Sequence, residues 1–242
     1  GRHLQLVTQQ SRSVSEYWWQ YDSQHLLYLH DPDGAENWHL YQTDLKGFNT
    51  RDLTPFHGVQ ARLIAYRAQA PDQMLIALNL QNRSRHDLYR LSLNHGALSL
   101  THVNSQGMID WLADADLEAR LAISINESGS FELLRRVANS TQWETAYKFP
   151  TTSQMPRLIS LSPDGKTACF QDHHQDSGNR LWTIDLATLT VTALGPETQE
   201  NILECLIDPM TGMPEGVAMN NHQRSWHMFR DAYGDMMDFL RF

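Results

Sequence analysis

Apolar and polar positions along the chain form short runs that break at turn-forming residues. The stretch 157–172, RLISLSPDGKTACFQD, shows the unit: an apolar run, Ser-Pro-Asp-Gly at 162–165, and a second apolar run. Proline presets φ for a turn, and Asp-Gly tolerates the left-handed region of backbone conformation. The pattern therefore predicts two extended strands joined by a tight reversal.

This unit recurs in groups of four runs, and the third run of each group carries a leucine. The four leucines are Leu40, Leu88, Leu133 and Leu181, so successive steps are 48, 45 and 48 residues. Four short strands repeating every ~40–50 residues are typical of a β-propeller blade. One small sheet cannot bury both of its faces alone, and stacking against neighbouring blades solves that problem.

We therefore expect an all-β fold, a β-propeller of four-stranded blades, with four full blades and most of a fifth. The expected blades, within one propeller domain or fragment covering 1–242, are approximately 15–56, 60–104, 107–150, 156–196 and 202–231. A β-sandwich is the alternative, but its strands would not fall into groups of four.

The last residues depart from the strand pattern, because their apolar positions are spaced at i, i+3, i+4 and i+7. This spacing predicts a short amphipathic helix over 231–241. Its apolar residues are Tyr233, Met236, Met237 and Leu240. Closed propellers have about 4–8 blades, so the chain is either a compact five-bladed ring or part of a larger one.

Composition and charge limit the classes of partner that the chain is expected to bind. The 242 residues carry a net charge of −9, and no long basic run offsets it, which argues against nucleic-acid binding. No apolar run approaches the ~20 residues that span a bilayer, and the first residues lack a signal-peptide core, so we expect a soluble protein without a membrane partner. These features favour the cytoplasm without assigning a compartment. Cys169 and Cys205 lack metal or redox spacing and are expected to be small core residues.

Three longer segments carry a family resemblance. They are YLHDPDGAENWHLYQTDL (28–45), DLTPFHGVQARL (52–63) and ILECLIDPMTGMPEGVAMNN (202–221). They resemble the N-terminal β-propeller of prolyl oligopeptidase (S9) family serine peptidases, nearest to the dipeptidyl/acylaminoacyl-peptidase-like branch. The most specific elements are D-x-D-G-x-E-N-x-x-L-Y, beginning at Asp31, and D-P-x-T-G-x-P, beginning at Asp208.

The resemblance implies a domain that gates access to a catalytic α/β-hydrolase domain of the same polypeptide, which cleaves short peptides. A family propeller has seven or eight blades, so the resemblance implies a fragment of such a ring. The chain contains no G-x-S-x-G motif, and we expect it to be inactive alone, with no catalytic residue of its own. The alternative is a stand-alone propeller that serves as a protein-interaction or binding scaffold, similar to TolB. An incomplete ring leaves strand edges unpaired, so we also expect the fragment to self-associate or rearrange.

Asp31, Asp33 and Glu36 lie close together in the sequence and superficially resemble a calcium loop. The EF-hand pattern fails, because the sixth and twelfth positions from Asp31 hold glutamate and glutamine. We expect a hairpin turn at Asp33-Gly34 in which a carboxylate supports its own backbone. Asp31 and Glu36 are also candidates for contact with a substrate amino group or a basic residue of the hydrolase domain.

Arg83 and Arg85 belong to the most basic segment, in the expected connection between the second and third strands of their blade. Arginine suits bidentate contact with a carboxylate, so both are candidates for substrate or interdomain contact; an exposed loop with nothing bound is the alternative. The segment DHHQD at 172–176 is expected to be a solvated loop, since adjacent strand histidines point to opposite faces. We expect no metal site and no cofactor. Most of the tryptophans are expected between sheets, with either Trp18 or Trp19 outside the core.

Overall fold

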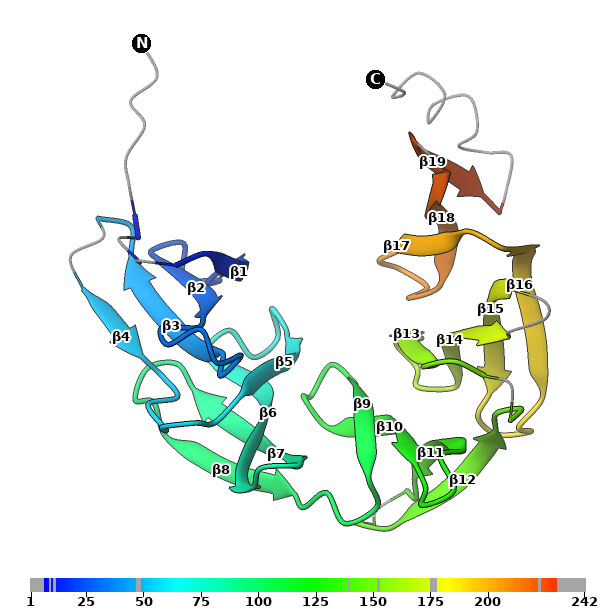
Figure 1. The fold of residues 1–242 in the computed structure, drawn as a ribbon, viewed down its shortest axis with the longest axis horizontal. Helices are drawn as coiled ribbons and strands as arrows, with labels where there is room; N and C mark the ends of the chain where they lie inside the picture. Colours follow the sequence, from blue (N-terminus) through cyan, green and yellow to red (C-terminus); the bar gives the residue numbers. More distant parts are fainter. Residues whose placement is uncertain are drawn as a thin grey trace. The chain divides into compact units, whose positions relative to one another are not determined.

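The computed structural model (Figure 1) describes residues 7, 8, 10, 12–46, 49–138, 140–151, 153–174, 178–221 and 223–229. Within them the chain forms five antiparallel sheets in chain order, four with four strands and one with three. Each strand pairs with its sequence neighbour, so every sheet is a simple meander. This is the blade architecture of a β-propeller, and the predicted fold class is confirmed.

The strand bounds follow the sheets. The first sheet contains β1 (Val14–Trp19), β2 (His25–His30), β3 (His39–Asp44) and β4 (Thr50–Asp52), and the second β5 (Ala61–Tyr66), β6 (Gln73–Asn82), β7 (Arg85–Ser92) and β8 (Leu98–His102). The third contains β9 (Met108–Ala113), β10 (Ala119–Ile125), β11 (Phe131–Arg136) and β12 (Trp143–Lys148). The fourth contains β13 (Arg157–Leu161), β14 (Thr167–His174), β15 (Gly178–Asp185) and β16 (Val191–Thr198), and the fifth β17 (Asn201–Ile207), β18 (Pro214–Asn221) and β19 (Gln223–Met228).

The chain divides into two compact units. The first unit is Gly1–Ser105 with Ala115–Glu118 and holds the first two sheets; the second is Gln106–Asp114 with Ala119–Phe242 and holds the other three. The approximate blade limits and the single propeller domain over the whole chain remain predictions.

The sequence period corresponds to a structural register. The four repeat leucines lie on the third strands β3, β7, β11 and β15, and each is at most 1% exposed. Their partners on the second strands are Leu29, Ala77, Ile123 and Gln171. The leucine step was therefore a true repeat of the blade, in which the same central position is buried each time.

In the first unit, the two sheets share one apolar core. Leu27 and Leu29 of β2 and Leu40 of β3 pack in a cluster with Met74, Ile76 and further residues of the second sheet. Burial of a leucine side chain contributes about 1.5–3 kcal/mol, so this cluster is a major stabilising contact between the sheets.

In the second unit, two clusters of this kind are formed by described residues. One joins the third and fourth sheets, where Phe149 and Phe170 meet edge to face with centroids 5.4 Å apart. The other joins the fourth and fifth sheets through Cys169, Leu181, Ile202 and Val217. Cys169 is a buried core residue, as predicted.

Trp18 and Trp19 separate as expected. Trp18 packs against the core of the first unit, whereas Trp19 is 63% exposed. The predicted helix over 231–241 lies outside the described residues. Among those that are described, no helix is long and apolar enough to cross a membrane.

Candidate functional site

The loop between β2 and β3 is organised by Asp31, whose side chain is buried. Its carboxylate accepts hydrogen bonds from the backbone amides of Gly34 at 3.0 Å and Glu36 at 2.9 Å. Burial acts to raise the pKa of Asp31, but these amides outweigh it, and the pKa lies below its ordinary value. The expected supporting carboxylate is therefore present, but it belongs to Asp31 and not to Asp33 in the turn itself.

Glu36 contributes to the same loop through its backbone. Its φ is 60°, in the left-handed region that few residues other than glycine adopt, and its side chain is exposed. Its carbonyl accepts a hydrogen bond from Nε2 of Gln60 at 3.0 Å. Glu36 thus ties the β2–β3 loop to the connection that leads into the second sheet.

Arg83 lies in the turn between β6 and β7, and Arg85 is the first residue of β7 instead of a loop residue. The guanidinium of Arg83 donates to the carbonyls of Gly58 and His57, the latter at 3.0 Å. Arg85 donates to the carbonyl of Ser105 at 3.4 Å. Both arginines therefore hold neighbouring connections of the first unit in place.

Three of the four predicted contact residues, Asp31, Glu36 and Arg83, are linked through one group of loops, whereas Arg85 contacts Ser105 instead. The amide of Gln60 donates to Oδ1 of Asn79 at 2.6 Å, and Nδ2 of Asn79 donates to the carbonyl of Arg83 at 3.1 Å. With the contact between Gln60 and Glu36, this makes a continuous chain from the β2–β3 loop to the β6–β7 turn. These bonds give the residues a structural role, and contact with substrate or another domain stays a prediction.

The first strands carry a second, unpredicted pattern. In each of the first four sheets, the residue of the second strand that pairs with the repeat leucine also pairs with a residue of the first strand. The pairs are Glu16 with Leu29, Arg62 with Ala77, Asp110 with Ile123, and Arg157 with Gln171. The equivalent first-strand position of four successive sheets is therefore occupied by a charged residue. Its charge alternates between negative and positive along the chain.

Sequence reasoning missed this set because it followed the leucines of the third runs, although the four charged residues recur at similar steps of 46, 48 and 47 residues. Their equivalence becomes visible in the strand pairing, which places each charged residue opposite the partner of a repeat leucine. The detectable signal was this spacing, together with a single charged residue in each of the four strands.

A groove lies between β1 and β5 in the first unit, with a volume of about 430 Å³. We call it the β1–β5 groove; its lining residues include Glu16, Trp18, Trp19, Tyr66 and Arg67. Tyr66 accepts a hydrogen bond from the amide of Tyr21 at 3.0 Å, and the two rings are 4.7 Å apart. The groove therefore combines an aromatic surface with one acidic and one basic side chain.

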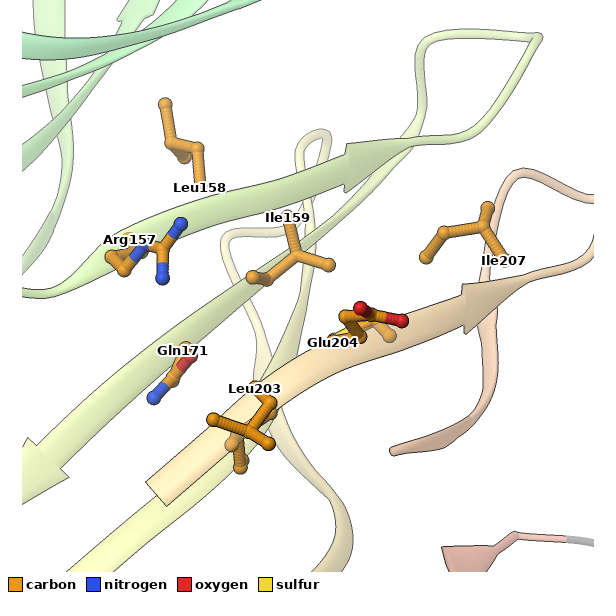
Figure 2. Close-up of a pocket in the computed structure, with 9 residues that line it drawn as sticks. Arg157, Leu158, Ile159, Gln171, Leu203, Glu204 and Ile207 are labelled. Atoms are coloured by element: carbon orange, nitrogen blue, oxygen red, sulfur yellow. The ribbon is translucent and has the colours of Figure 1, made fainter. Parts of the chain in front are cut away.

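The second unit has a groove between β13 and β17, with a volume of about 270 Å³. In this β13–β17 groove, Arg157 comes from β13 and Glu204 from β17. Figure 2 shows Ile159 and Glu204 extending from facing strands into the space between them, with Leu203 nearer the start of β17. Both charged residues are exposed, so each is accessible to a ligand in the groove.

Cys205 lines the β13–β17 groove as well. Burial raises the pKa of its thiol to about 11, although the nearby positive charge of Arg157 acts in the opposite direction. A thiol with this pKa stays protonated near neutral pH and is a poor nucleophile. The groove is therefore suited to binding and not to thiol chemistry.

Asp172 corrects the prediction of a solvated loop for DHHQD. It lies within β14, is 1% exposed, and accepts a hydrogen bond from Oγ of Ser153 at 3.0 Å. Positions 175–177 lie outside the described residues. In the part of the chain that the structure covers, no group of three or more histidine, cysteine, aspartate or glutamate residues is placed to hold a metal ion.

No protein-family model matches this chain. The chain is similar in sequence to one curated protein and similar in fold to solved structures. Dipeptidyl aminopeptidase BIII from Pseudoxanthomonas mexicana is 32% identical over 232 residues, covering 93% of this chain and 33% of the relative. The chain thus spans about a third of the length of this curated relative.

Two solved structures show the same fold. TolB from Acinetobacter baumannii has a TM-score of 0.59 and 16% identity, over 90% of this chain and 52% of its own. A puromycin hydrolase variant in complex with PGG has a TM-score of 0.51 and 16% identity, over 86% of this chain and 33% of its own. At this identity the similarity establishes the fold alone.

Proposed function

The chain is homologous to part of an S9-family dipeptidyl aminopeptidase, as its sequence motifs predicted, and on this premise we propose that it is a non-catalytic propeller domain. It docks on an α/β-hydrolase domain of the same polypeptide and admits short peptides to that domain. Hydrolysis of the peptides belongs to the hydrolase, which is of the serine-peptidase type.

One observation carries this proposal: almost the whole chain aligns with only a third of a peptidase. The aligned part contains no G-x-S-x-G motif. That motif sits on a strand-to-helix turn, whereas the described strands form antiparallel meanders. The chemistry of a serine peptidase must then come from the other two thirds of such a polypeptide.

The first strands supply a surface for gating. In the second unit, the first strands β9 and β13 of two successive blades contact each other. Blades of a propeller surround a central channel, which their first strands line. A peptide that passes along the first strands of the second unit meets Asp110 of β9 and Arg157 of β13.

A binding scaffold is the second candidate function. The two grooves favour it, because each offers a concave surface with polar and apolar groups but no catalytic set. In that case the chain binds its ligand without any hydrolase domain. The fold fits both functions, since one fold can carry many functions.

The test compares the polypeptide encoded by the native reading frame with a version that lacks residues 1–242. We expect the full polypeptide to cleave short peptides and to reject a long unstructured peptide with the same cleavable end. Deletion should abolish this size limit. If the deletion variant does not fold, Asp110→Ala in the full polypeptide is the second variant, since it loosens contact between two first strands. An unchanged size limit in a folded deletion variant overturns the proposal.

A further inference from the structure

The β1–β5 groove and the β13–β17 groove have the same arrangement of charged side chains. In the β1–β5 groove, Glu16 comes from β1 and Arg67 follows β5; in the β13–β17 groove, Arg157 comes from β13 and Glu204 from β17. Each groove therefore has an acidic group on one wall and a basic group on the other. Carbon-rich side chains occupy the space along the walls.

This arrangement is complementary to a ligand with one cationic end, one anionic end and an uncharged middle. A guanidinium binds a carboxylate through paired N–H donors, and a carboxylate accepts hydrogen bonds from an ammonium group. The volume of about 430 Å³ lies in the lower part of the ~300–1,000 Å³ range of ligand pockets, and the volume of about 270 Å³ lies just below that range. A chain of a few residues suits that size better than a long segment.

We propose that both grooves bind short peptides with free termini, with the peptide carboxylate on Arg67 or Arg157 and the peptide ammonium on Glu16 or Glu204. The choice of peptides as the ligand class rests on the proposed function. The grooves act as binding sites along the first strands and prefer peptides whose two ends are both charged over peptides whose ends are blocked.

The register of first-strand charges supplies one member of each pair. Glu16 and Arg157 belong to the set of equivalent first-strand positions, and Arg67 and Glu204 complete the pairs among the residues that line the two grooves. The apolar wall of the β13–β17 groove, with Ile159 and Leu203 seen in Figure 2, contacts the uncharged middle of the ligand. The aromatic wall of the β1–β5 groove does the same.

The test measures binding to the 242-residue chain by NMR, with trialanine as the probe. Three matched peptides separate the charges: trialanine amide keeps the ammonium, N-acetyl-trialanine keeps the carboxylate, and N-acetyl-trialanine amide has neither. Signals of Trp19 report on the β1–β5 groove, and signals of Ile159 report on the β13–β17 groove. We expect the doubly blocked peptide to bind most weakly at both.

Variants assign each end in the β13–β17 groove. Arg157→Gln should weaken trialanine about two- to fivefold, the range for one exposed charge pair, and leave trialanine amide unchanged. Glu204→Gln should weaken trialanine amide and leave N-acetyl-trialanine unchanged. Arg120→Gln, which removes an exposed arginine paired with Asp114, is the matched control and should change nothing. Glu16→Gln and Arg67→Gln apply the same test to the other groove.

The proposal is overturned if trialanine does not shift the groove signals, if all four peptides bind equally, or if Arg157→Gln weakens both trialanine and its amide to the same extent. Binding to this chain and the size limit of the full polypeptide are separate measurements. If the chain binds peptides in the charge-dependent way but the full polypeptide shows no size limit, the gating function alone is contradicted. If the full polypeptide shows the size limit but the chain does not bind peptides in this way, the groove assignment alone is contradicted.

Discussion

The carboxylate of Asp110 on β9 accepts a hydrogen bond from the backbone amide of Leu158 on β13 at 2.8 Å. It also accepts one from the amide of Trp111 at 2.8 Å. A side chain of one sheet thereby satisfies a backbone donor on the first strand of the next sheet. This contact joins two blades through their edge strands, where backbone groups otherwise need solvent or a partner.

Asp110→Ala should lower the free energy of unfolding by about 1–3 kcal/mol, because the substitution removes the acceptor for two backbone amides. Asp110→Asn should cost less, since its side-chain oxygen still accepts a hydrogen bond. Urea unfolding of the chain measures both. Glu197→Ala is the control: its carboxylate is 43% exposed and lies 3.9 Å from the guanidinium of Arg180, so about 0.2–1 kcal/mol is expected. Equal costs at Asp110 and Glu197 would show that the contact between sheets has no special weight.

Asp31→Ala should destabilise the chain by about 2 kcal/mol, because a charged acceptor of two backbone amides is lost from the β2–β3 loop. Asp33→Ala, in the same loop with an exposed side chain, is the matched control and should stay within about 0.5 kcal/mol. The folded-state pKa of Asp31 is lowered from 3.8, so its contribution is present above the unfolded value and is lost as pH falls through the folded value. The free energy of unfolding of Asp31→Ala and of Asp33→Ala is measured as a function of pH. Two curves that stay parallel below pH 4 would argue against this account.

His39 should titrate above its ordinary pKa of 6.5. The hydrogen bond from its Nδ1 to Oδ2 of Asp52, at 2.7 Å, favours the charged ring and raises the pKa of His39. The pair therefore stabilises the fold at pH values below the unfolded pKa of His39, and this contribution disappears as pH rises through the folded pKa. NMR titration measures the shift, and Asp52→Asn should lower the pKa of His39.

His86 provides the internal contrast in the same titration. Burial lowers its pKa to about 4, and the charge of Arg62 acts in the same direction. His86 should then remain neutral across the range in which His39 changes charge. Coincident titration of the two histidines would contradict the environments that the structure assigns to them.

Trp18→Ala should cost about 3 kcal/mol, since the indole packs against the core of the first unit and its removal leaves a cavity. Trp19→Ala should stay within about 0.5 kcal/mol, because this side chain is 63% exposed. Chemical denaturation gives the two costs. A larger loss at Trp19 than at Trp18 would reverse the assignment of these neighbours.

The four-strand grouping was predictable because the buried leucine of each third strand faces the same packing requirement in every blade. Leu40, Leu88, Leu133 and Leu181 meet that requirement at nearly equal spacing. The identity of the loop-supporting carboxylate was not predictable, because Asp31 and Asp33 differ only in where the backbone directs their side chains. Asp172 was misassigned since a buried hydrogen bond to Ser153 compensates for its polarity, and a sequence does not reveal that partner.

The charged register and the grooves depend on which first-strand residue stands opposite which second-strand residue. Glu16, Arg62, Asp110 and Arg157 recur at steps of 46, 48 and 47 residues, but spacing alone does not show that each stands opposite the partner of a repeat leucine. Sequence spacing therefore located the blades but not the residues that line the grooves.

The central proposal is that this chain is the non-catalytic propeller part of a serine peptidase. The most direct measurement is hydrolysis of a short peptide substrate by the purified 242-residue chain and by the full polypeptide of its native reading frame, side by side. We predict turnover by the full polypeptide and none by the chain. Turnover by the chain alone, or a full polypeptide that binds the peptide without cleaving it, would contradict the account.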